Sequence, residues 1–189
     1  NFAVKAFQDT MMRVRYSKTP VVVAPHNLTL GGGCELTMHA DKVVAHAESY
    51  IGLVEFGVGL IPGGGGTKEF VKRLSEELIE GDIRINALRE RFLTVGQAKV
   101  GTSAHEAFDL GYLREGQDEV IVSREYQLTR AKAACLEMAN KGYTAPLREK
   151  NITIMGQEGL GIVYVGAHSM QSGKYISEHD QLISEKLGF

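Results

Sequence analysis

Cysteine, proline and long apolar runs are scarce in this chain of 189 residues. Two cysteines leave no disulfide framework and no cysteine-based zinc cluster, and we expect no metal site. Their scarcity fits a reducing, cytoplasmic compartment. No run of about 18 apolar residues occurs, so no membrane span is expected. With 21 basic and 23 acidic residues the net charge is −2, which provides no broad basic surface for nucleic acid.

Glycine is the residue that stands out in an otherwise ordinary globular composition. Apolar residues make up 43% of the chain and charged residues 23%, and a chain of this length can bury a substantial core. The 22 glycines are clustered, with three at residues 31–33 and six between residues 57 and 66. Glycine clusters mark backbone that adopts positive φ or approaches another group closely. The two clusters are therefore the first places where a functional site is expected.

Hydrophobic patterning predicts alternating strands and helices in the first half of the chain. Short apolar runs predict strands at residues 21–24, 43–45 and 51–54. Helical patterning predicts helices at residues 2–14, 34–40 and 67–74, the last capped by Thr67. Further on, it predicts helices at residues 85–92, 104–110, 123–141 and 176–187, with a strand or extended piece at residues 152–155. This alternation favours the α/β class.

The first glycine cluster lies directly before a predicted helix that carries Glu35. A helix N-terminus exposes backbone N–H groups, which favour negative charge. Such donors stabilise the oxyanion that forms when a carbonyl is attacked or enolised. Glu35 follows Gly32 by three residues and lies on the same side of the first turn. Its carboxylate is either a catalytic group near the ligand of Gly32 or a partner of the helix dipole.

Glu55 follows an apolar run, 20 residues after Glu35. A carboxyl group in apolar surroundings has a raised pKa unless it is paired. Two carboxyl groups that face one pocket acquire different pKa values, which provides one acid and one base. The alternative is that Glu55 is a surface residue at the end of a strand.

Residues 25–67 resemble the crotonase, or enoyl-CoA hydratase/isomerase, family. The motifs that carry the resemblance are Leu-Gly-Gly-Gly-Cys-Glu-Leu at 30–36, Ala-Asp at 40–41, Glu55, Gly-Leu-Ile-Pro-Gly at 59–63 and Gly-Gly-Thr at 65–67. Residues 103–113 are similar to a later family element. Residues 151–155 and 173–180 resemble the C-terminal hydratase part of fused bacterial 3-hydroxyacyl-CoA dehydrogenase/enoyl-CoA hydratases.

The resemblance implies a crotonase-like spiral of ββα turns with trailing C-terminal helices. We expect a crotonase-like core over residues 1–122 and a helical C-terminal extension over residues 123–189. Both ends of the sequence look cut, so a truncated fragment is expected. The family's other oxyanion donor belongs to a segment before the opening helix, and no residues here match that segment, so the fragment by itself is expected to lack a complete site.

The activity that the resemblance implies is that of a lyase, the hydration of trans-2-enoyl-CoA to 3-hydroxyacyl-CoA in fatty acid β-oxidation. Glu35 would activate water for attack on C3, and Glu55 would deliver a proton to C2. Gly32, with Gly31 and Gly63, would bind the thioester oxygen and the substrate. The implied partner is an acyl-CoA, and a homo-oligomer stays open. No cofactor is implied, because CoA is part of the substrate and NAD would belong to a separate dehydrogenase domain.

Two alternative functions stay open. An isomerase that shifts a double bond between C3 and C2 would use one dominant carboxylate. A non-catalytic module that binds acyl-CoA or assembles subunits would need neither glutamate.

Other sequence features received structural interpretations. Residues 63–68 lack the Gly-Lys-Ser/Thr order of a phosphate loop. Cys34 is interpreted as a buried packing residue, and the histidines at 26, 39 and 46 are interpreted as structural residues. The basic stretch is interpreted as a solvated helix face, with a CoA phosphate contact as the weaker alternative; its members are Lys5, Arg13, Arg15 and Lys18.

Overall fold

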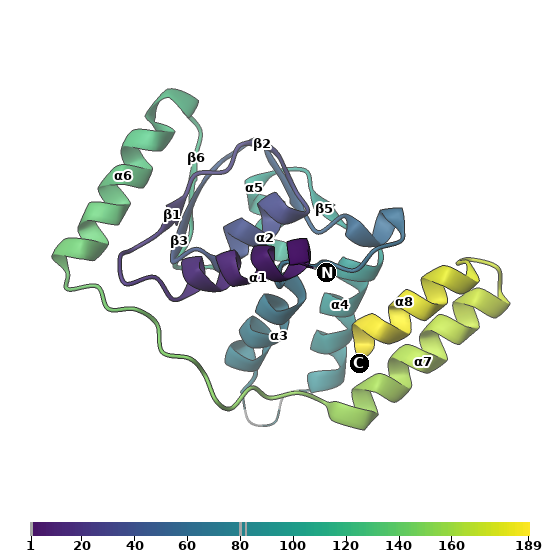
Figure 1. The fold of residues 1–189 in the computed structure, drawn as a ribbon. Coiled ribbons are helices and arrows are strands. Elements are labelled where there is room, and N and C mark those ends of the chain that lie inside the picture. Colours follow the sequence, from purple (N-terminus) through teal and green to yellow (C-terminus); the bar gives the residue numbers. More distant parts are fainter. Residues whose placement is uncertain (1, 80, 82) are drawn as a thin grey trace.

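Strands and helices alternate through the first half of the chain (Figure 1). The structure is a computed structural model that describes residues 2–79, 81 and 83–189. The elements are α1 (Phe2–Arg15), β1 (Val22–Val23), β2 (Asn27–Leu30), α2 (Gly32–His39), β3 (Lys42–His46), β4 (Ser49–Gly52), the short 3-10 helix η1 (Glu55–Val58) and α3 (Gly66–Glu77). The predicted α/β class is confirmed.

Helices dominate the second half. Its elements are α4 (Arg84–Gly96), β5 (Val100–Gly101), α5 (Ala104–Asp109), β6 (Glu119–Ile121), α6 (Arg124–Asn140), α7 (Gly156–Ser172) and α8 (Glu178–Gly188). Figure 1 shows α7 and α8 side by side at one end of the molecule, with α6 at the other end. The irregular segment 141–155 connects α6 to α7. The trailing C-terminal helices are therefore present as expected.

The two strands of each of the first two strand pairs, β1 with β2 and β3 with β4, belong to different sheets. In the described residues, β1, β3 and β6 form one parallel sheet, while β2 and β4 pair in parallel in a second sheet with β5 antiparallel to β4. The chain passes from β1 to β2, then through α2, and then from β3 to β4. Each turn thus adds one strand to each sheet, which is the ββα spiral that was expected.

The core lies where α2 packs against the sheets and α3. Cys34 and Met38 from α2 are fully buried with Ile51 and Tyr112. The packing interpretation of Cys34 is confirmed, and burial raises the pKa of its thiol. The Tyr112 hydroxyl donates to the carbonyl of Lys99 at 2.8 Å and accepts from a backbone N–H at 3.2 Å, so its burial leaves it hydrogen-bonded.

Arg73 of α3 links distant parts of the core through backbone carbonyls. Its guanidinium is 4% exposed and donates to the carbonyl of Met38 at 2.7 Å, to that of Gly111 at 3.0 Å and to that of Tyr112 at 2.9 Å. Burial lowers the pKa of Arg73 to about 10. The three carbonyls partly replace the water that the buried guanidinium has lost.

Helix α6 covers the first sheet. The Gln127 amide donates to the carbonyls of Pro25 and Val44 at 2.8 and 2.9 Å, and Ala131 and Ala134 pack near Val44. The start of the C-terminal extension at residue 123 stays a prediction. None of the described helices combines the length and apolar character needed to cross a membrane.

Several boundaries differ from those that the sequence predicted. The short strands β2, β5 and β6 and the whole of α7 were missed, and residues 152–155 form no strand. The strand predicted at residues 51–54 lies at 49–52, so Glu55 opens η1 instead of ending a strand. Thr67 does not cap α3: the N-cap is Gly65 at φ 105°, a backbone conformation that glycine adopts without strain.

Candidate functional site

The N-terminus of α2 presents backbone N–H groups without helical acceptors. Gly31 is the N-cap at φ 54°, and the helix begins when the N–H of Glu35 donates to the Gly31 carbonyl at 2.9 Å. The N–H groups of residues 32–34 precede that bond and have no acceptor inside the helix. No described side chain caps this end of the helix. The geometry therefore matches the expected anion-favouring terminus, although α2 starts two residues earlier than predicted.

Glu35 is held by the glycine loop, which we define as residues 63–66. Its side chain is 1% exposed. The carboxylate accepts from the N–H of Gly64 at 2.8 and 2.9 Å and from the N–H of Gly66 at 2.9 Å. These bonds compensate the burial of the carboxylate and fix its position. The sequence predicted the place of Glu35 on α2, but not these partners.

The glycine loop has no room for side chains where it meets Glu35. A Cβ at Gly64 would overlap both the Glu35 carboxylate and the ring of Phe7. A Cβ at Gly66 would lie 2.9 Å from a methyl carbon of Leu53. Close approach of backbone to a carboxylate is the reason for glycine at these positions.

Glu55 lies beside Gly31, the N-cap of α2. Its Oε1 is 3.3 Å from the position that a Cβ of Gly31 would take. Its Oε2 is buried and has no hydrogen-bond partner among the described residues. Burial raises the pKa of Glu55, and the charge of Glu35 raises it further. The two glutamates thus interact electrostatically but occupy different environments.

The predicted site residues come together around one helix terminus. Gly31 borders Glu55, Gly32 starts α2, and Gly64 next to Gly63 borders Glu35. The two carboxyl groups have different surroundings. Glu35 accepts three backbone hydrogen bonds, whereas Glu55 has an unpaired oxygen. Such a pair can serve as one base and one acid.

Helix α1 covers this cluster, and the sequence reasoning missed its contribution. Phe7 lies against Gly32, with its Cζ 3.0 Å from the position of a Cβ there. The amide of Gln8 donates to the carbonyl of Gly63 at 2.9 Å, and Val4 approaches the same glycine. Residues 4, 7 and 8 share one face of a helix. That spacing was the available signal, but the sequence did not indicate what the face contacts.

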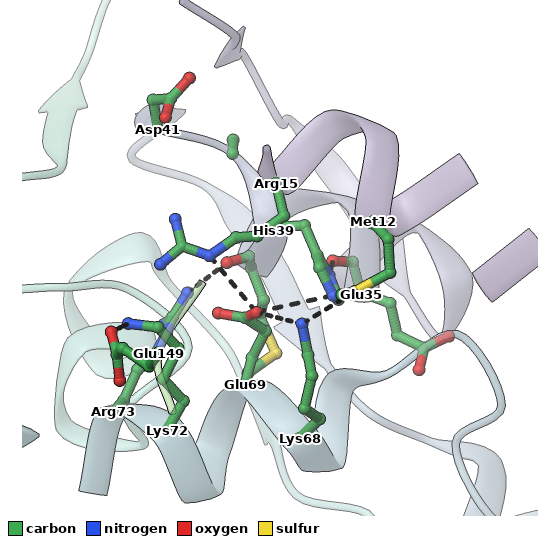
Figure 2. Close-up of polar contacts among 12 residues, drawn as sticks. Met12, Arg15, Glu35, His39, Asp41, Lys68, Glu69, Lys72, Arg73 and Glu149 are labelled. Carbon is green, nitrogen blue, oxygen red and sulfur yellow. Dashed lines mark hydrogen bonds and ion pairs between the residues drawn. The ribbon is translucent and has the colours of Figure 1, made fainter. Parts of the chain in front are cut away.

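A buried polar cluster lies beside the glycine loop (Figure 2). At its centre is Glu69 of α3, which is 1% exposed. One carboxylate oxygen lies 2.6 Å from the Lys68 ammonium, 3.5 Å from Nε of Arg15 and 3.6 Å from Nε2 of His39. Burial raises the pKa of Glu69, but the opposing attraction of Lys68, Arg15 and His39 outweighs it, and the pKa lies below its ordinary value.

This cluster connects directly to Glu35. The Nδ1 of His39 is 2.7 Å from the Glu35 carbonyl, and burial lowers the pKa of His39. Nδ1 therefore carries the proton and donates. The burial and bonding of His39 agree with its interpretation as a structural residue. The interpretation of Arg15 as part of a solvated face was wrong, because Arg15 is 9% exposed and faces Glu69.

Two cavities lie away from Glu35 and Glu55. One, of about 290 Å³, is lined mainly by apolar side chains of α3, α4, α7 and α8. The other, of about 600 Å³, has a charged lining from α1, α3 and the segment after α6. Among the described residues, no group of three or more His, Cys, Asp and Glu side chains is arranged to hold a metal ion.

Comparisons with known proteins point to a single family. Residues 2–87 match the family described as enoyl-CoA hydratase/isomerase. The chain is 41% identical over 189 residues to a probable 3-hydroxyacyl-CoA dehydrogenase of Bacillus subtilis, covering all of this chain and 23% of that protein. It is 30% identical over 135 residues to a probable enoyl-CoA hydratase of the same organism, covering 71% of this chain and 45% of that protein.

A third relative has a broader name. A putative fatty acid oxidation complex trifunctional enzyme of Rickettsia felis is 44% identical over 70 residues, which cover 37% of this chain and 10% of that protein. The match thus spans less than a quarter of the Bacillus subtilis dehydrogenase and a still smaller part of the Rickettsia felis enzyme.

Solved structures share the fold. The enoyl-CoA hydratase of Bacillus anthracis matches with a TM-score of 0.57 at 24% identity, over 99% of this chain and 59% of that one. A putative enoyl-CoA hydratase of Rhodopseudomonas palustris matches with the same TM-score at 20% identity and the same coverage. The expected fold is confirmed.

Proposed function

Because this chain belongs to the enoyl-CoA hydratase/isomerase, or crotonase, family, we propose that it provides the site that hydrates trans-2-enoyl-CoA to 3-hydroxyacyl-CoA. The observation that carries the proposal is the contrast between the two glutamates at the N-terminus of α2. Glu35 accepts three hydrogen bonds from two backbone N–H groups, and Glu55 has a buried, unpaired oxygen and a raised pKa.

The two carboxyl groups divide the proton transfers of the addition. The raised pKa of Glu55 keeps its proton to higher pH, so this group delivers the proton to C2. Glu35 takes a proton from the water whose oxygen forms the bond to C3. The N–H of Gly32 binds the thioester oxygen while negative charge develops there, with Gly31 and Gly63 shaping the substrate site. One water is added, and the substrate gains one proton at C2 and one hydroxyl at C3.

The different surroundings of Glu35 and Glu55 also favour hydration over the isomerase and over the non-catalytic binding module. An isomerase needs one dominant carboxyl group, whereas here two interact electrostatically in distinct environments. A module that only binds acyl-CoA gains nothing from burying an unpaired carboxyl oxygen, which is unfavourable for folding. The arrangement needs no cofactor of its own, and CoA enters as part of the substrate.

A place in fatty acid oxidation is part of the proposal. The names of the Bacillus subtilis dehydrogenase and the Rickettsia felis trifunctional enzyme support it. In the proposed arrangement, NAD-dependent oxidation of the hydroxyacyl product takes place in a separate domain of one bifunctional protein, and a cytoplasmic homo-oligomer is the proposed setting.

The test is Glu55→Gln in the full-length protein that carries this chain. The amide keeps the shape of the side chain but has no proton to transfer, so kcat for hydration of crotonyl-CoA should fall by about 10²–10⁴-fold. Affinity for the acyl-CoA, measured by ligand titration, should stay within a few-fold. Glu48→Gln, at an exposed position before β4, is the matched control and should leave both quantities unchanged.

Two results would contradict the proposal. If affinity falls as far as the rate, Glu55 holds the ligand or the fold instead of moving a proton. If neither quantity changes, the site is elsewhere and the binding-module alternative gains support. Glu35→Gln should also lower kcat, but the amide faces the N–H groups of Gly64 and Gly66 and disturbs the loop, so Glu55→Gln is the cleaner test.

A further inference from the structure

The ring of Phe7 touches both ends of the proposed reaction site. It contacts Gly32, whose N–H would bind the oxygen on C1 of the substrate, with Cζ 3.0 Å from the position of a Cβ. It also lies close to Gly64 where that residue meets the Glu35 carboxylate. In the proposed reaction, this carboxylate takes a proton from the water that attacks C3. A ring that lies near the groups proposed to act on C1 and on C3 would lie alongside C2.

Glu55 and Phe7 lie near different glycines of the site. Glu55 borders Gly31, whereas Phe7 borders Gly32 and Gly64. The proton for C2 would therefore come from the carboxyl group beside Gly31, and the ring would border C2 next to Gly32 and Gly64. The ring is held there by its neighbours on α1, because Gln8 donates to Gly63 at 2.9 Å and Val4 lies against the same glycine.

We propose that Phe7 is a specificity-determining residue that restricts the site to enoyl groups without a substituent at C2. This inference rests on the proposed hydratase function. The ring is half-buried and already lies close to Gly32 and Gly64, so on its packed side it has little room to move away from an added methyl group. One methyl group that fits poorly in an apolar site changes kcat/KM by about 10-fold or more.

The test compares two substrates that differ by that methyl group. Crotonyl-CoA is unbranched, and tiglyl-CoA carries one methyl at C2. The measured quantity is the ratio of kcat/KM for tiglyl-CoA to that for crotonyl-CoA in the full-length protein. Phe7→Ala should raise the ratio by about 10-fold or more, because it removes the ring next to C2. Phe2→Ala removes the same ring from the same helix at a position that is 88% exposed and should leave the ratio unchanged.

A second variant guards against loss of folding. Phe7→Leu keeps an apolar contact with Gly32 and should raise the ratio by a smaller factor. A ratio that stays within two-fold of the wild-type value in the folded Phe7 variants, while crotonyl-CoA is still hydrated, overturns the role of Phe7 and leaves the hydratase proposal intact. If the wild-type protein hydrates neither substrate, the proposed function fails and the role of Phe7 fails with it.

Discussion

The region of the glycine loop and the hairpin of α7 and α8 bury different kinds of side chain. Helix α3, which follows the loop, buries the ionisable residues Glu69, Lys72 and Arg73. Helix α7 is longer, yet its buried residues are Gly159, Val163 and Ala167. One region places charge in its interior, and the other buries a narrow stripe of small and apolar residues.

The difference between the two regions indicates a role for the buried charges around Glu69. Burying ions is costly, and well-packed apolar side chains often give equal or greater stability. The ions around Glu69 instead join α1, α2 and α3 at the place where the glycine loop holds Glu35. We infer that the charges around Glu69 fix the position of the glycine loop and Glu35. Apolar packing is enough to hold α7 against α8.

Removing the central carboxylate should produce the largest difference between the two regions. Glu69→Ala leaves Arg15 buried without its ion-pair partner, so the free energy of unfolding should fall by about 3–5 kcal/mol. Glu158→Ala, at an exposed position in the first turn of α7, should lower it by at most about 1 kcal/mol. Urea denaturation measures both. Similar losses in the two variants would remove the contrast.

A single methyl group should have opposite effects in the two regions. Gly64→Ala forces a Cβ into Glu35 and Phe7, so it should lower the free energy of unfolding by about 1–3 kcal/mol and reduce hydration of crotonyl-CoA. Gly161→Ala lies in α7, where a Cβ would meet no described atom within 4 Å. It should raise the free energy of unfolding by about 0.5–1 kcal/mol, because alanine favours helix more than glycine does. Equal signs for the two variants would contradict this prediction.

The pH dependence of stability should show the smallest effect. Burial lowers the pKa of His39, with Lys68 and Arg15 acting in the same direction and Glu69 against them. The unfolded chain therefore takes up this proton near pH 6.5, before the folded protein does. The His39 contribution to the unfolding free energy is present above that pH and is lost as pH falls through the folded pKa.

The variant His39→Gln should flatten this part of the pH profile of the unfolding free energy. His168→Gln, on an exposed position of α7, is the control and should keep the parental slope. Denaturant titrations between about pH 5 and 8 measure the slope. A slope in His39→Gln equal to that of the wild type would show that the buried imidazole does not contribute.

Local features of the site could be predicted from the sequence, and its long-range contacts could not. Three glycines before an apolar helix were enough to expect an open N-terminus with Glu35 in the first turn. The partners of Glu35 follow it by 29 and 31 residues and depend on how the loop closes, which no local pattern encodes. Phe7 was missed for the same reason, since its contacts belong to Gly32 and Gly64.

The fold shows the same division between local and long-range information. Helix α7 was missed because glycines at 156, 159, 161 and 166 lower its intrinsic helix propensity. Its helicity is decided by packing against α8, where Gly188 lies close to Val163. The strand β2 was missed because only four residues form it, and pairing with β4 defines it.

The carbonyls that hold Arg73 also affect the order in which the molecule matures. Residues 31–66, which contain both glutamates and the glycine loop, leave the ribosome before Gly111 and Tyr112 do. Gly111 follows Arg73 by 38 residues, a delay of roughly 2–8 s at ordinary rates of synthesis. During that interval the guanidinium lacks two of its three acceptors and remains better solvated by water than by protein. The segment that contains both glutamates is thus complete in sequence before the carbonyls that fix α3 against it are available.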